Sequence, residues 1–272
     1  MAAVVRAGAP VNLRRARRVL SFNGCGQGVG RVRVAPEGIP IIASFVLVSA
    51  ALSTGAVWWL GGWGWLIVAP LALVTLWSVW FFRDPDRQTP DEPGAVICPA
   101  DGVICFIGPA EPPPGLGLPR EHTTGLTRLS VFMNVFNVHV NRSPAGGRVE
   151  NLVYAPGTFL NASLDKASEH NERMTMVLRP DDGPPLIVVQ IAGLVARRIV
   201  CRVSEGTRLR PGERYGLIRF GSRVDVYLPP GRAASVRVGD RVVAGETIVA
   251  RAAGVGSAGP TGSAREAAHA GA

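Results

Sequence analysis

A long uncharged segment dominates the hydrophobic pattern of the first third of the chain. Residues 38–82 contain no Asp, Glu, Lys or Arg, and the run is about twice the roughly 20 residues that one helical membrane span requires. The sequence Gly-Gly-Trp-Gly at 61–64 interrupts it near its middle, where a turn is favoured. The pattern therefore predicts a transmembrane hairpin of two helices, approximately residues 40–60 and 65–82. A buried core hairpin of a soluble protein is the alternative, although core helices seldom run this long without a charge.

Beyond Pro93 the pattern changes to short apolar runs separated by Gly, Pro and Asp, and it continues to Arg251. Runs such as 186–189 and 223–227 have the length and the β-branched content of strands, so this part is predicted to be a compact, mainly β domain. The segment 236–248 has a Gly-Asp turn followed by Ala-Gly, and it resembles the hammerhead sheets of biotinyl and lipoyl domains. We therefore expect a barrel-sandwich domain. This segment carries no Lys to which biotin or lipoate could be attached.

These patterns divide the chain into four segments. Residues 1–37 are rich in Arg, Ala and Gly without an apolar period, so we expect a basic, disordered tail. Residues 38–82 are the predicted membrane hairpin, and residues 83–253 are the predicted β-rich domain. Residues 254–272 are rich in Gly, Ala and Ser and are expected to be a second disordered tail.

Arginine dominates the charge balance, which is formally +9, and Lys166 is the only lysine. Arginines precede and follow the apolar run but are absent from its central turn, so both ends of the hairpin should face the cytoplasm. This predicts a protein of the cell membrane whose β domain contacts anionic lipid headgroups on the cytoplasmic side. The arginines are scattered rather than clustered with aromatic residues, which argues against nucleic-acid binding. The four cysteines form no CxxC pair and no metal-ligand spacing with His, so no metal is expected.

The strand-like run 218–228 contains Gly221-Ser222, a pair at which the chain could cleave itself. If Ser222 Oγ adds to the Gly221 carbonyl, the peptide bond becomes an ester. β-Elimination then leaves dehydroalanine, which hydrolyses to an N-terminal pyruvoyl group. Gly221 must stay small for this close approach. An ordinary turn often contains the same dipeptide, so the pair alone does not establish the reaction.

Self-cleavage needs a base, and histidine is the natural choice because its ordinary pKa lies near 6.5. Of the four histidines, His269 lies in the C-terminal tail and His122 in a polar loop, which leaves His139 and His170. A histidine on a strand is also common as a structural residue, so the residues alone leave this choice open.

Four further motifs accompany Gly221-Ser222 in sequence order. They are Cys-Pro-Ala-Asp-Gly at 98–102, Phe-Met-Asn-Val-Phe-Asn-Val-His-Val-Asn-Arg-Ser-Pro at 132–144, Asn-Ala-Ser-Leu-Asp-Lys at 161–166 and Ala-Arg-Arg-Ile at 196–199. Together they resemble phosphatidylserine decarboxylase proenzymes, from about Arg31 to about Arg251, and most closely the short bacterial and archaeal form. Longer members have a second His and a Leu-Gly-Ser-Thr cleavage sequence. Here Phe136 lies near the position of that His, and Phe220 and Arg223 flank the cleavage pair.

The resemblance implies a carboxy-lyase that converts phosphatidylserine to phosphatidylethanolamine after autocatalytic cleavage between Gly221 and Ser222. Ser222 would become a covalent pyruvoyl cofactor, whose ketone acts as an electron sink in the manner of pyridoxal phosphate. His139 would be the base, and Asp101 the carboxylate that holds its imidazole in the right tautomer. Residues for binding the phospholipid headgroup, by charge and motif, are Arg142, Lys166, Arg197, Arg198 and His170.

The two cleavage products are expected to remain together as a non-covalent complex, and the sequence leaves open whether the protein is a homo-oligomer. Three other functions remain as alternatives. One is a membrane-anchored hammerhead adaptor without catalytic activity, and another is decarboxylation of an archaeal ether-lipid analogue. The third is a serine hydrolase, against which stands the absence of a G-x-S-x-G elbow around Ser222.

Overall fold

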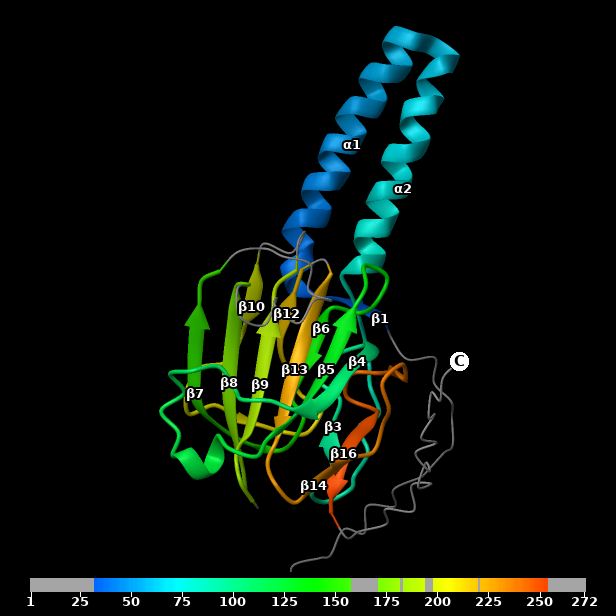
Figure 1. Ribbon diagram of the computed structural model, residues 1–272. Helices are drawn as coiled ribbons and strands as arrows, with labels where there is room; N and C mark the ends of the chain where they lie inside the picture. The colour runs from blue at the N-terminus through cyan, green and yellow to red at the C-terminus, as the bar shows by residue number, and fades with distance from the viewer. Residues whose placement is uncertain (1–31, 158–170, 182, 194–197, 220, 254–272) are drawn as a thin grey trace, which may run out of the picture.

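The computed structural model describes residues 32–157, 171–181, 183–193, 198–219 and 221–253. Within them the chain forms a mainly β domain, from which one long apolar helical region extends (Figure 1). Residues 1–31 of the predicted N-terminal tail and residues 254–272 lie outside the described residues, as do Lys166, His170 and Arg197.

The helical region consists of η1 (Pro36–Gly38), α1 (Ile39–Leu60), η2 (Gly61–Gly64) and α2 (Trp65–Phe81). α1 ends at Leu60, and Gly61 follows it with a φ of 55°, which suits a residue without a side chain. α1 and α2 lie side by side (Figure 1), and the hydroxyl oxygens of Ser49 and Thr75 are 3.0 Å apart between them. The stretch Pro36–Phe81 is long and apolar enough to cross a membrane, by length and composition, and very little of it is buried within the chain.

Residues 32–37 differ from the disordered tail expected from the sequence. β1 (Val32–Val34) pairs with β2 (Arg83–Pro85), so the two ends of the helical region are joined where it meets the β domain. Glu37 is buried there and forms ion pairs with Arg202 and Arg214. These contacts order the segment, and they involve residues far away in the chain, which the local composition of the tail does not reveal.

The β domain contains an eight-stranded antiparallel sheet with the strand order β11-β7-β8-β9-β13-β5-β4-β15. Two three-stranded sheets, β10-β12-β6 and β14-β16-β3, contribute to the same hydrophobic core. The strands of the large sheet are β4 (Gly102–Pro109), β5 (Thr127–Met133), β7 (Gly147–Ala155), β8 (Arg173–Pro180), β9 (Leu186–Ile191), β11 (Arg208–Leu209), β13 (Ser222–Leu228) and β15 (Arg241–Val242). Those of the small sheets are β3 (Val96–Ile97), β6 (Val140–Arg142), β10 (Ile199–Cys201), β12 (Arg214–Ile218), β14 (Arg232–Ala234) and β16 (Ile248–Ala252). One short helix, η3 (Arg120–His122), lies in the connection before β5.

The predicted mainly β domain is confirmed, whereas the finer barrel-sandwich assignment stays a prediction. The segment expected to form a hammerhead is divided between two sheets. β15 pairs with β4 at the edge of the large sheet, and β16 pairs with β14 and β3 in a small one.

β13 lies between β9 and β5 and is buried along its whole length. Successive residues of a strand point to opposite faces of the sheet. Val224 and Val226 accordingly belong to the main core, while Tyr227 belongs to a second cluster. Ser222, two residues before Val224, starts the strand on the face of the main core. The alternation therefore places a hydroxyl among apolar side chains.

Candidate active site

Ser222 is fully buried at the first position of β13, opposite Met133 of β5. Its Oγ has no hydrogen-bond partner among the residues that the structure describes. Gly221, directly before it, has a φ of 55°, a conformation that costs other residues roughly 1–2 kcal/mol. Buried polar atoms in proteins are nearly always hydrogen-bonded, so an unpartnered serine hydroxyl beside a left-handed glycine needs an explanation.

His139 immediately precedes β6 and has no exposed surface. Its Nδ1 lies 2.9 Å from the carbonyl oxygen of Asn137. Since a carbonyl only accepts, Nδ1 carries the proton and Nε2 of the neutral ring is an acceptor. Nε2 is buried and has no partner within the described part of the chain.

Burial lowers the pKa of His139 to about 4. The hydrogen bond to Asn137 opposes this shift, and the positive charge of Arg83 adds to it. The imidazole is therefore neutral near pH 7 and able to accept a proton, which is what a general base requires.

Strand pairing joins His139 to the segment that leads into the cleavage pair. β6 and β12 are antiparallel, and the backbone nitrogen of Ile218 donates to the His139 carbonyl oxygen at 3.2 Å. Ile218 stands four positions before Ser222 in the chain. The fold thus brings the predicted base and the predicted nucleophile into one region, although they are 83 positions apart in the sequence.

The foot of α2 forms one wall of this region. The ring of Phe81 stacks on the imidazole of His139, with 4.3 Å between ring centroids. Arg83 donates to the carbonyl oxygens of Trp80, at 2.9 Å, and Phe136, at 2.7 Å, and so ties the turn before His139 to the end of the helix. The side chain of Phe136 is 65% exposed beside this contact. The candidate site therefore lies where the helical region meets the β domain (Figure 1).

Asp101 does not contact His139, which differs from the predicted arrangement. Its carboxylate accepts from Arg87 Nη2, at 2.8 and 3.1 Å, and from the backbone nitrogen of Ala244, at 2.7 Å. The Asn137 carbonyl orients the imidazole instead. Burial lowers the pKa of Arg83, and the negative charge of Asp101 opposes this shift, so Asp101 acts on the site through charge.

The predicted headgroup-binding residues have different environments. The guanidinium of Arg142 donates to Asp84 Oδ1, at 2.6 Å, and to the carbonyl oxygens of Pro85 and Gly212. Arg198 is exposed next to β10. Lys166, Arg197 and His170 lie outside the described residues.

Four residues that the sequence reasoning missed shape the site: Phe81, Arg83, Arg87 and Asn137. Phe81 and Arg83 flank the end of the apolar run, and Asn137 lies two residues before His139. These positions are the only feature of the sequence that could have indicated a role in the site. Their contacts depend on the tertiary fold.

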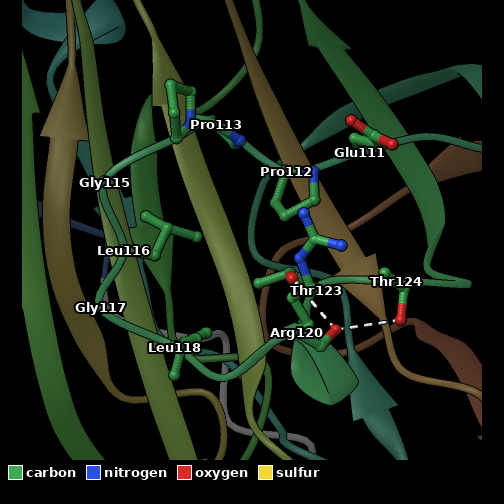
Figure 2. Close-up of a pocket in the computed structure, with 11 residues that line it drawn as sticks. Glu111, Pro112, Pro113, Gly115, Leu116, Gly117, Leu118, Arg120, Thr123 and Thr124 are labelled. Carbon is green, nitrogen blue, oxygen red and sulfur yellow. Dashed lines mark hydrogen bonds between the residues drawn. The ribbon is translucent and has the colours of Figure 1, made fainter.

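A separate surface pocket of about 460 Å³ is lined by residues 111–118 with Arg120, Thr123 and Thr124. Figure 2 shows the two threonine hydroxyls directed at the Arg120 carbonyl oxygen, to which both donate. None of the site residues described above lines this pocket, so it is not assigned to the reaction.

Comparison with known proteins identifies related chains. A sequence model described as phosphatidylserine decarboxylase matches residues 74–250. The phosphatidylserine decarboxylase proenzyme of Paramagnetospirillum magneticum is 51% identical over 217 residues, which cover 79% of this chain and 85% of that protein. The proenzyme of the same name from Ruegeria pomeroyi is 49% identical and covers 79% and 93% of the two chains, and that of Cereibacter sphaeroides is 55% identical and covers 69% and 78%.

Proposed function

Since the chain belongs to the phosphatidylserine decarboxylase family and is an enzyme of that class, we propose that it matures by cleaving itself between Gly221 and Ser222. The proenzyme names of its relatives support a precursor that is processed. One observation in the structure carries the proposal: the Oγ of Ser222 and the Nε2 of His139 are both buried and both without a partner in the described residues.

In the proposed maturation, Ser222 Oγ gives its proton to His139 Nε2 and adds to the Gly221 carbonyl carbon. The bond from that carbon to the Ser222 nitrogen then breaks as the nitrogen takes up a proton, which leaves an ester. Removal of the Cα proton of residue 222 expels the Gly221 carboxylate and gives dehydroalanine. Its hydrolysis releases ammonia and leaves the pyruvoyl group at the new N-terminus.

Asp101 enters this proposal as a positioning residue. Its charge stabilises the Arg83 guanidinium, which holds the Phe136 carbonyl oxygen. The turn from residue 134 to 137 is closed by Asn137 Oδ1, which accepts from the Asn134 backbone nitrogen at 2.9 Å. The backbone carbonyl oxygen of Asn137 accepts from Nδ1 of His139 and so fixes its tautomer. Asp101 would thus act on the imidazole through Arg83 and this turn.

The surroundings of Ser222 suit a group made from the serine itself, because its hydroxyl is buried in the core and has no partner among the residues that the structure describes. The pyruvoyl ketone supplies an electron sink for the charge left on the substrate when carbon dioxide departs. His139 stays neutral near this position and can move a proton at Nε2, and the Phe81 ring over the imidazole limits access of water.

We further propose that the helical region is a membrane hairpin with the β domain in the cytoplasm. Its exposed apolar side chains support this assignment: Trp58 and Trp59 are 82% and 81% exposed, whereas a core hairpin would bury them. The distribution of arginine supports the orientation. The hairpin would hold the active site at the leaflet that contains the substrate.

Intact-mass spectrometry of the purified full chain tests the proposal. We expect two chains, residues 1–221 and 222–272, with the smaller about 17 Da lighter than the unmodified peptide because ammonia is lost. The Ser222→Ala chain is the control and should stay intact. A single uncleaved wild-type chain without decarboxylase activity would favour the adaptor, and an uncleaved chain that hydrolyses esters would favour the hydrolase.

A further inference from the structure

Two arginines lie side by side just beyond the paired ends of β10 and β12. Ile199 of β10 is opposite Ile218 of β12, so Arg198 and Arg219 are the next facing pair. The backbone nitrogen of Arg219 donates to the Arg198 carbonyl oxygen at 3.4 Å, which continues the ladder by one step. The backbones of Arg198 and Arg219 are therefore held next to each other by strand pairing, and their side chains extend from adjacent positions.

Neither guanidinium has a hydrogen-bond or ion-pair partner among the residues that the structure describes. Arg219 is half-buried, and its Nε is buried without an acceptor. Burial, followed by the charge of Arg198, lowers the pKa of Arg219. Glu37 is the acid whose charge acts on Arg219, but its carboxylate already binds Arg202 and Arg214. The arrangement holds a partly desolvated cation next to a second cation, which is costly unless an anion joins them.

The location indicates which anion. Glu37 belongs to η1, directly before α1, so Arg219 lies at the foot of the helical region. A bilayer crossed by that region places its headgroup layer immediately outside the hydrocarbon core, at this level of the protein. Arg219 is also three positions from Ser222 in the chain. An anion here would be at lipid-headgroup depth and close to the reacting serine.

We propose that Arg198 and Arg219 together bind the phosphodiester of the substrate headgroup, an assignment that rests on the function proposed above. Guanidinium groups bind phosphate oxygens through paired, charge-assisted hydrogen bonds, and two of them can share one phosphodiester. Arg142, the other described candidate, is already engaged by Asp84 and two carbonyl oxygens. This binding would hold the serine carboxylate of the lipid at a fixed reach from residue 222.

The test is steady-state decarboxylation by Arg198→Gln and Arg219→Gln full chains in mixed micelles of detergent and phosphatidylserine. Rates are expressed per pyruvoyl group so that incomplete maturation does not distort them. We expect KM to rise about tenfold for each variant, equivalent to about 1.4 kcal/mol of lost binding, with a smaller change in kcat. Inorganic phosphate should compete with the lipid in the wild type and compete less well in both variants.

Arg208→Gln is the matched control, because Arg208 is an exposed arginine on the edge strand β11. It should leave KM unchanged. Arg219→Lys keeps the charge and should recover part of the loss. An unchanged KM in Arg198→Gln overturns the proposal. This holds even if Arg219→Gln fails to mature and cannot be assayed.

Two other anions give different results. If the pair binds bulk anionic lipid, both variants lose affinity for phosphatidylglycerol vesicles while KM per bound enzyme is unchanged. If it binds the new carboxylate of Gly221, the two mature chains separate more readily and KM is again unchanged. Either result overturns the proposal, whereas a wild-type chain that neither cleaves nor decarboxylates refutes the proposed function itself.

Discussion

The environment of His139 predicts an unusual pH dependence of self-cleavage. Its pKa is lowered from the ordinary 6.5 to about 4 because the imidazole is buried against Phe81 and near the Arg83 charge. Only a neutral imidazole can take the proton of Ser222. The cleavage rate should therefore be constant from pH 8 down to about 5.5 and fall by half near pH 4, instead of falling by half near pH 6.5.

The same shift has a consequence for stability, whose sign follows from proton uptake. Between pH 6.5 and 4 the unfolded chain binds a proton at residue 139 that the folded chain excludes, so the free energy of unfolding decreases as the pH is lowered. One pKa unit corresponds to about 1.4 kcal/mol, and the full shift therefore amounts to roughly 3 kcal/mol. Above pH 7 this contribution is constant.

The assay uses chain freshly made by cell-free synthesis, diluted into buffers from pH 3.5 to 8, with the 222–272 fragment followed on gels over time. Ser222→Ala should give no fragment at any pH, and His122→Gln, a change in η3 outside the site, should leave the profile unchanged. Urea unfolding then compares the free energies of unfolding of the Ser222→Ala chain and of the same chain with His139→Asn added. The difference between the two free energies should vary with pH only below about 7. A half-maximal cleavage rate near pH 6.5 would refute the buried, neutral imidazole.

Three substitutions extend this reasoning. Gly221→Val should abolish cleavage on gels, because a β-branched residue at a φ of 55° is strained by at least about 1–2 kcal/mol and crowds the attacked carbonyl; a Val chain that cleaves at the wild-type rate contradicts the role of this conformation. Phe81→Ala should reduce the free energy of unfolding by about 3 kcal/mol, seen as a lower thermal midpoint. It should also move the pH midpoint of cleavage from about 4 toward 6.5, because water reaches His139. An unmoved pH midpoint argues against shielding by Phe81. Asp101→Asn breaks the ion pair with Arg87 and should slow cleavage while leaving the pH midpoint near 4, since the Asn137 carbonyl still holds the imidazole; a midpoint that shifts would instead indicate direct contact between Asp101 and His139.

Features with a local cause could be predicted from the sequence, and those made by distant contacts could not. The uncharged length of the apolar run predicts the helical region, and the short apolar segments bounded by Gly, Pro and Asp predict a mainly β domain. The motif around His139 predicts the base only through its resemblance to the family, and this role stays a prediction. The partners of Asp101 were not predictable in this way, because Arg87 and Ala244 lie near opposite ends of the sequence of the β domain. Residues 32–37 were assigned to a tail for the same reason: β1 acquires its partner only after the chain has passed through both helices.

In the proposed membrane-bound enzyme, the helical region would contribute to the site as well as to membrane attachment. The predicted base, His139, packs against Phe81, the last residue of α2, and its supporting turn is held by Arg83, two residues later. Glu37, at the other end of the region, binds Arg214 of β12, the strand that leads into Gly221 and Ser222. The helical region thus contacts both sides of the candidate site: α2 contacts the predicted base, and η1 contacts the strand that leads to the predicted cleavage pair. An anchor linked only by a flexible tether would bring the enzyme to the membrane but leave the angle between site and bilayer free. If the helical region spans the membrane as proposed, this attachment would fix that angle, so that a lipid headgroup would meet Ser222 and His139 from one direction.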